Sequence, residues 1–85
     1  MRVTVGTHHI DKGLHLVTNP LILALQDCWP EALIIPTYDY DVVEFIGVDR
    51  ITRMIRLPYE AEKFMLDYEV GAELYPIEFD LDTGF

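Results

Sequence analysis

The chain has 85 residues, 51% of them hydrophobic, and its 15 acidic against 6 basic side chains give a formal net charge of −9. This length suits one domain over residues 1–85, and the apolar content is too high for a disordered chain. The charge disfavours direct binding to nucleic acid or to an anionic membrane, and no apolar run is long enough to predict a membrane span. The lone cysteine cannot form an internal disulfide, so we expect a reducing, cytoplasmic setting.

The first 30 residues predict one strand and two helical segments. Alternating polar and apolar residues predict a strand over Arg2–Val5. Thr7 is expected to cap a short helical turn that ends at a glycine, Gly13. Asn19-Pro20 combines a favoured N-cap with a proline at the first helical position. The apolar run that follows predicts the central core helix, which Pro30 ends.

Residues 31–57 are rich in β-branched and aromatic side chains. Ala32–Ile35 and Val42–Val48 predict strands, and Asp49-Arg50 is a candidate turn. The next segment, Ile51–Leu57, fits either a strand or a helix capped by Asp49. We favour a hairpin because the preceding strand is strong and the connection is short.

The C-terminal part predicts a second main helix and a last strand. Pro58 opens a helix whose buried face is Ala61, Phe64, Met65 and Tyr68. The alternating segment that follows, from residue 75 to 81, predicts a half-buried strand with one acidic face. The expected fold is therefore α+β: an antiparallel sheet of four or five strands packed against two main helices plus a short N-terminal helical turn.

Negative charge is concentrated in the last third of the chain. Residues 59–85 contain eight carboxylates against Lys63 alone, a sum of −7, whereas residues 1–30 sum to zero. Between them, Arg50, Arg53 and Arg56 make a locally positive segment. The acidic third is either a solvated face that keeps the domain soluble or an electrostatic docking surface.

The strongest candidate site is a row of carboxylates on the last predicted strand. Glu78, Asp80 and Asp82 recur every two residues, about 6.5–7 Å apart at standard strand rise. They either protect an edge strand from pairing with other chains or imitate a phosphate backbone and bind a basic protein. Glu69 and Glu73 extend the same acidic segment. We predict that these five residues contact a partner.

Two tyrosines form the second candidate, in the aromatic and acidic loop between the first two strands of the central region. Tyr38 and Tyr40 each precede an aspartate. Exposed tyrosines suit recognition because they combine contact area with a polar tip. They either anchor a partner or cover the edge of the sheet.

No metal site, cofactor or catalytic activity is expected. The adjacent residues His8 and His9 should point in different directions, and with His15 they are expected to lie at the surface. Cys28 falls on the apolar stripe of the core helix and is expected to be a buried structural cysteine. The sequence contains no Gly-rich phosphate loop, nucleophile elbow, or kinase or zinc-protease motif.

Several short motifs are spread across most of the chain. They are Ile10-x-x-Gly13, Asn19-Pro20-Leu21-Ile22-Leu23-Ala24-Leu25, Ile55-Arg56-Leu57-Pro58-x-x-Ala61-x-x-Phe64-Met65, Asp67-Tyr68-Glu69-x-Gly71 and Pro76-Ile77-Glu78-Phe79. Together they resemble a widespread family of small phage proteins, best represented among phages of actinobacteria. The Asn19-Pro20 pair stands where that family usually has Cys-Pro, and the loop 36–41 is particular to this sequence. The family has no established activity, so no residue role is carried over.

The resemblance implies a phage origin and a role inside the host cell. Small acidic phage proteins without catalytic motifs are typical inhibitors of host enzymes or defence systems. We therefore expect a non-catalytic protein that binds a basic host protein, including one that itself binds nucleic acid, through the acidic face. The alternative is a structural or self-assembling phage protein that forms a homodimer through the edge strand Leu74–Leu81.

Overall fold

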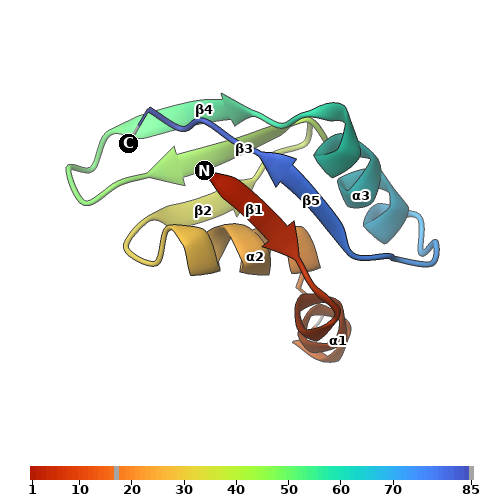
Figure 1. Ribbon diagram of the computed structural model, residues 1–85. Coiled ribbons are helices and arrows are strands. Elements are labelled where there is room, and N and C mark those ends of the chain that lie inside the picture. The colour runs from red at the N-terminus through yellow and green to blue at the C-terminus, as the bar shows by residue number, and fades with distance from the viewer. Residues whose placement is uncertain (17, 85) are drawn as a thin grey trace.

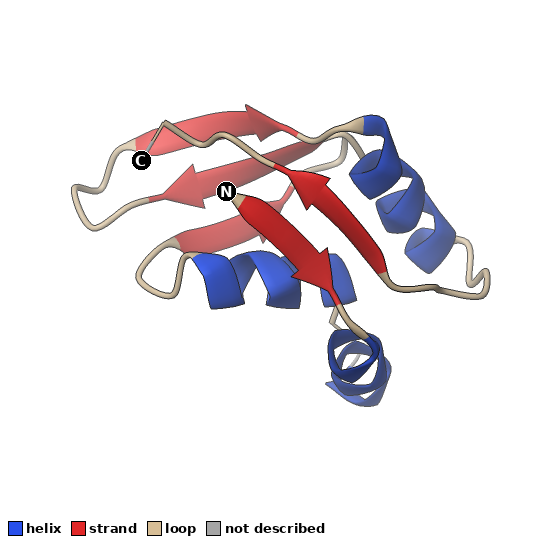
Figure 2. Ribbon diagram, in the orientation of Figure 1, coloured by secondary structure: helices blue, strands red, loops and turns tan. Residues whose placement is uncertain are grey.

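The protein folds into three helices and five strands in this computed structural model, which describes residues 1–16 and 18–84 (Figures 1 and 2). The side chains of residues 15 and 16 lie outside that description. In chain order the elements are β1 (Arg2–Val5), α1 (Thr7–Leu16), α2 (Pro20–Cys28), β2 (Leu33–Pro36), β3 (Val42–Ile46), β4 (Thr52–Arg56), α3 (Tyr59–Glu69) and β5 (Ile77–Asp80).

The α+β class is confirmed, but the prediction of a single sheet was wrong. All five strands pair antiparallel, in a three-stranded sheet β2-β3-β4 and a separate two-stranded sheet β1-β5. The first is a meander of neighbours in sequence, whereas the second joins the two ends of the chain. Helix α2 contacts both β1 and β2, so helix packing rather than hydrogen bonding connects the sheets. Figure 1 shows β5 between β1 and α3.

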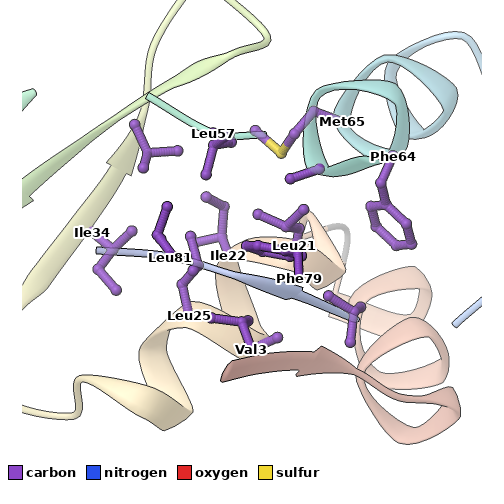
Figure 3. Packing of buried hydrophobic residues seen from close by; sticks show 14 of the residues in the cluster. Val3, Leu21, Ile22, Leu25, Ile34, Leu57, Phe64, Met65, Phe79 and Leu81 are labelled. Carbon is purple, nitrogen blue, oxygen red and sulfur yellow. The ribbon is translucent and has the colours of Figure 1, made fainter. Parts of the chain in front are cut away.

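Both sheets and the helices share one hydrophobic core. Apolar side chains from α2 occupy its centre, as predicted, and those of Leu21 and Leu25 are fully buried. Leu81, just beyond β5, lies between Ile34 and Leu25 and brings the C-terminal segment onto the three-stranded sheet (Figure 3). The core therefore depends on residues from both ends of the chain.

Helix α1 is longer than the predicted turn and does not end at Gly13. It continues to Leu16, and Gly13 lies inside the helix at the point where α1 approaches the start of α2. A Cβ atom at Gly13 would lie 2.5 Å from the Thr18 carbonyl oxygen and 2.6 Å from Cγ of Pro20. Glycine is therefore required here for close packing rather than for a left-handed helix end.

The predicted boundaries of α2 are confirmed. The Asn19 side chain accepts a hydrogen bond from the backbone N–H of Leu21 at 2.9 Å, which caps the helix. Trp29 follows the last turn and packs edge-on against Phe45, with ring centroids 5.3 Å apart. This aromatic pair fixes the C-terminal end of α2 against β3.

The favoured hairpin over residues 42–57 is also confirmed. Strand β3 ends at Ile46, two residues earlier than predicted, because Gly47 already belongs to the turn and accepts the N–H of Arg50 at 2.9 Å. Arg50 adopts a left-handed conformation with φ of 62°. Asp49 accepts the N–H of Ile51 at 3.0 Å, and this bond lowers the pKa of the Asp49 carboxyl.

Helix α3 buries Ala61, Phe64 and Met65 as predicted, with Tyr68 half-buried. The last strand is shorter than predicted, because Tyr75 is 64% exposed and precedes β5. None of the described helices is long and apolar enough to cross a membrane.

Candidate interaction surfaces

The carboxylate row on β5 is interrupted by a cation from the other end of the chain. Arg2 pairs with Asp80 in the β1–β5 register. Its guanidinium lies 3.2 Å from Glu78 Oε2 and 3.3 Å from Asp80 Oδ2, and these contacts raise the pKa of Arg2. Glu78 and Asp80 are exposed, but their charge is partly neutralised within the molecule. The partner strand could not be identified from sequence because it lies 76 residues away.

Asp82 lies beyond the end of β5 rather than on the same strand. Its carboxylate accepts the N–H of Gly84 at 3.0 Å and remains exposed. The predicted row of three carboxylates therefore consists of two strand residues and one residue of the C-terminal segment.

Glu69 and Glu73 lie at the end of α3 and in the loop after it. Both are exposed, and neither contacts a cation among the described residues. Glu73 accepts a hydrogen bond from the Tyr75 hydroxyl at 2.8 Å, which raises the pKa of Tyr75. A carboxylate in the last turn of a helix opposes the helix dipole, and α3 has no basic residue there to compensate. Helix stability therefore does not explain Glu69.

A shallow groove of about 80 Å³ separates α3 from the segment that leads into β5. Its apolar walls carry carboxylates, and Asp67 is paired with Lys63 at 2.9 Å. This volume is too small for a typical ligand but suits one side chain. The lining residues are Glu60, Lys63, Phe64, Asp67, Leu74, Tyr75 and Ile77.

Tyr38 and Tyr40 lie on the loop between β2 and β3, away from Glu69 and Glu73. Tyr38 is fully exposed and Tyr40 is 39% exposed. The backbone N–H of Leu57 bonds to the carbonyl of Asp41 at 2.6 Å, which holds this loop beside the start of α3. The seven predicted contact residues therefore form three separate groups: the β5 segment, the end of α3 with its following loop, and this tyrosine loop.

The prediction that the histidines lie at the surface was wrong for His9. Its side chain is buried, whereas His8 is exposed, and the His15 side chain lies outside the described part of the chain. His9 Nδ1 accepts the backbone N–H of Gly6 at 3.0 Å, so Nε2 carries the proton and donates to Asp27 Oδ2 at 2.6 Å. His9 thus fastens the start of α1 to the end of α2.

His8, His9 and Asp27 are also the described group with the geometry closest to a metal site. One ligand atom from each lies within 4.8 Å of the other two. An ion on His9 Nε2 would move the ring proton to Nδ1, where it would face the N–H of Gly6 instead of accepting from it. The hydrogen bonds of His9 therefore favour a structural clasp over metal binding.

Cys28 lines a second groove and is half-buried rather than fully buried as predicted. The groove has a volume of about 260 Å³. Burial, together with the nearby charge of Asp27, raises the pKa of the Cys28 thiol. The cysteine therefore has the character of an unreactive apolar side chain. The groove is lined by Cys28, Trp29, Pro30, Glu31, Ala32, Gly47 and Val48.

The sequence pattern did not identify one apolar surface of the molecule. The face of the three-stranded sheet that points away from the core, called here the outer sheet face, carries several exposed or half-exposed apolar side chains. Alternation along each strand signals two faces, but the strand register was needed to show that these positions adjoin one another. The outer sheet face consists of Leu33, Ile35, Val42, Glu44, Ile46, Thr52, Met54 and Arg56.

Comparison with known proteins adds no family to this description. No protein-family model matches the chain, and searches of curated proteins and of solved structures likewise found no match.

Proposed function

We propose that the protein is a non-catalytic binding protein that docks its acidic side onto a basic surface of a host protein and inhibits it. The acidic side is defined here as the exposed carboxylates of α3, the loop after it and the β5 segment, namely Glu60, Glu62, Glu69, Glu73, Glu78, Asp80 and Asp82. The observation that carries the proposal is that most of these exposed carboxylates have no cation beside them among the described residues. Such a surface repels itself and is stabilised when a partner supplies positive charge.

The groove between α3 and the segment before β5 is a suitable receptor for a lysine or arginine side chain of the partner. Leu74 and Ile77 offer apolar contact for the methylene stem of such a side chain. Glu60 also lines the groove, forms no ion pair with any described residue, and is available to the charged head, whereas Lys63 in the same groove is paired with Asp67. Tyr75 lines the same groove and adds aromatic area.

Mimicry of a nucleic acid is the sharper form of this proposal. Because Arg2 neutralises part of the charge of Glu78 and Asp80, the carboxylates of α3 and the loop after it are better placed to imitate phosphates. The resemblance to phage proteins implies that the protein acts inside a bacterial host. The proposed partner is therefore a DNA- or RNA-binding protein of that host. Tyr38 and Tyr40 would contact a different part of such a partner, since they lie at the other end of α3.

A matched pair of charge variants tests the proposal. Glu69→Gln with Glu73→Gln removes two charges from the acidic side, and the control, Asp11→Asn with Glu31→Gln, removes two exposed charges elsewhere. Each protein is immobilised and exposed to an actinobacterial lysate, and captured proteins are quantified by mass spectrometry with and without competing duplex DNA. Capture is then repeated at increasing salt.

The proposal predicts a basic protein that is retained by wild type and by the control but lost with the Glu69/Glu73 variant. Its capture should decline with salt and, for mimicry, with added DNA. Equal capture by both variants, or capture indifferent to salt, would show that the acidic side is not the docking surface.

A further inference from the structure

The outer sheet face has an apolar character that an isolated domain does not need. The register places Leu33 beside Ile46, and places Glu44 between Ile35 on one side and Met54 on the other. Leu33 is 57% exposed and Met54 is 60% exposed. Clustered apolar side chains on one face of a sheet are typical of a surface that packs against another protein.

Glu44 restricts what can cover this face. Its carboxylate lies at the centre of the apolar positions and is half-buried, yet it has no ion pair or hydrogen bond with any described residue. A partner that removed water from Glu44 without providing a cation would leave a buried unpaired charge. The occupant must therefore bring a positive side chain to the middle of the interface.

A second copy of the chain meets this requirement through Arg56. Arg56 is on the same face, one strand away from Glu44, and its side chain is 82% exposed. Among the described residues its ion-pair partner is Asp41, at the long distance of 3.9 Å. A two-fold axis between the two positions would place Glu44 of each copy opposite Arg56 of the other.

The distribution of charge favours the same occupant. The outer sheet face holds one acidic and one basic residue, and the adjoining turn adds one of each, Asp49 and Arg50. Seven of the 15 acidic residues belong to α3, the loop after it and β5, which are not part of this face. Two copies therefore approach here with less like-charge repulsion than at their acidic sides.

We propose that the protein forms a symmetric homodimer in which two outer sheet faces pack together and Glu44 pairs with Arg56 across the interface. This contact is separate from the acidic side, so it neither requires nor excludes the proposed inhibitory function. In the dimer both acidic sides remain accessible, which makes the assembly bivalent toward a partner with repeated basic sites.

A charge-swap experiment tests the pairing with the full chain. The mass of wild type is measured by light scattering after size exclusion and by sedimentation equilibrium, beside Glu44→Arg, Arg56→Glu and an equimolar mixture of the two variants. Each single variant places like charges opposite each other and should weaken dimerisation about tenfold or more. In the mixture, the introduced arginine of one variant faces the introduced glutamate of the other, and the unchanged Arg56 and Glu44 also pair, so dimers should return.

Replacement of an apolar residue of the outer sheet face by a charged one provides the second test. Met54→Glu on the outer sheet face should give a monomer, whereas the control Val70→Glu, which adds the same charge at an exposed apolar position after α3, should remain dimeric. Circular dichroism checks that every variant is folded. A wild type that stays monomeric at high micromolar concentration, a mixture that stays monomeric while wild type dimerises, or equal masses for the Met54 and Val70 variants would overturn the proposal.

Discussion

His9 occupies the helix position at which glutamate or glutamine usually completes a capping box. The carbonyl of Gly6 accepts the first backbone hydrogen bonds of α1. Three residues further on, His9 Nδ1 accepts a hydrogen bond from the backbone N–H of Gly6. The other ring nitrogen reaches Asp27 on α2. One buried ring therefore satisfies a helix terminus and joins two helices.

Substitution of His9 separates these two functions. His9→Ala should lower the free energy of unfolding by about 2 kcal/mol, because the helix cap and the bond to Asp27 are both lost. His9→Gln should cost less, since a glutamine can still accept the N–H of Gly6. Urea titration followed by circular dichroism measures both values. Equal losses would contradict the capping role.

The thiol of Cys28 should react slowly with alkylating reagents. Burial raises the pKa of the Cys28 thiol above that of an ordinary cysteine, so less thiolate is present near neutral pH than in an unfolded chain. We expect the rate of iodoacetamide alkylation in the native protein to be below the rate in denaturant at the same pH. A native rate that exceeded the denatured one would show an activated thiol.

At the level of elements, local patterns predicted the helices and strands but not their pairing. Asn19-Pro20 correctly predicted the start of α2, and the spacing of Ala61, Phe64 and Met65 correctly predicted the buried face of α3. The β1–β5 pair could not be predicted. The alternation of polar and apolar residues in Arg2–Val5 predicts a strand, but it does not show which distant strand forms hydrogen bonds with it. For the same reason the ion pairs of Arg2 and the outer sheet face were missed.

Gly13 provides a test of element packing in which the usual effect of a substitution should be reversed. Glycine to alanine within a helix ordinarily stabilises by about 0.5–1 kcal/mol. Here the added methyl group would meet the Thr18 carbonyl and Pro20, so we expect a loss of about 1–3 kcal/mol. Thermal unfolding of Gly13→Ala is compared with that of Lys12→Ala, at an exposed site on the same helix. A stabilised Gly13→Ala would contradict the close contact of α1 and α2.

At the scale of the whole molecule, repulsion between like charges destabilises the folded state. The net charge of −9 is concentrated in the C-terminal third. Arg2 on the N-terminal strand neutralises part of that charge, because it pairs with Glu78 and Asp80. Much of this repulsion acts between exposed groups, which dissolved ions screen effectively. The protein should therefore be more stable when salt is present.

We expect the melting temperature to rise between about 0.02 M and about 0.2 M NaCl, a range over which the screening length falls severalfold. Arg2→Gln should melt lower than wild type at low salt, and the difference should narrow as salt is added. Differential scanning fluorimetry measures both trends. A melting temperature that fell with salt would show that attractive ion pairs outweigh the repulsion.

The β1–β5 pairing also has a consequence for how the chain folds during translation. Strand β1 is made before the other elements of this domain, yet its hydrogen-bonding partner β5 is made after all of them. Until then Val3 and Val5, which are fully buried in the finished fold, have no strand to cover them. The central hairpin can form early because its contacts are local, whereas the β1–β5 sheet cannot form until β5 has been made. A nascent chain that stalls before residue 77 would therefore leave the apolar side chains of β1 exposed, where chaperones can bind them.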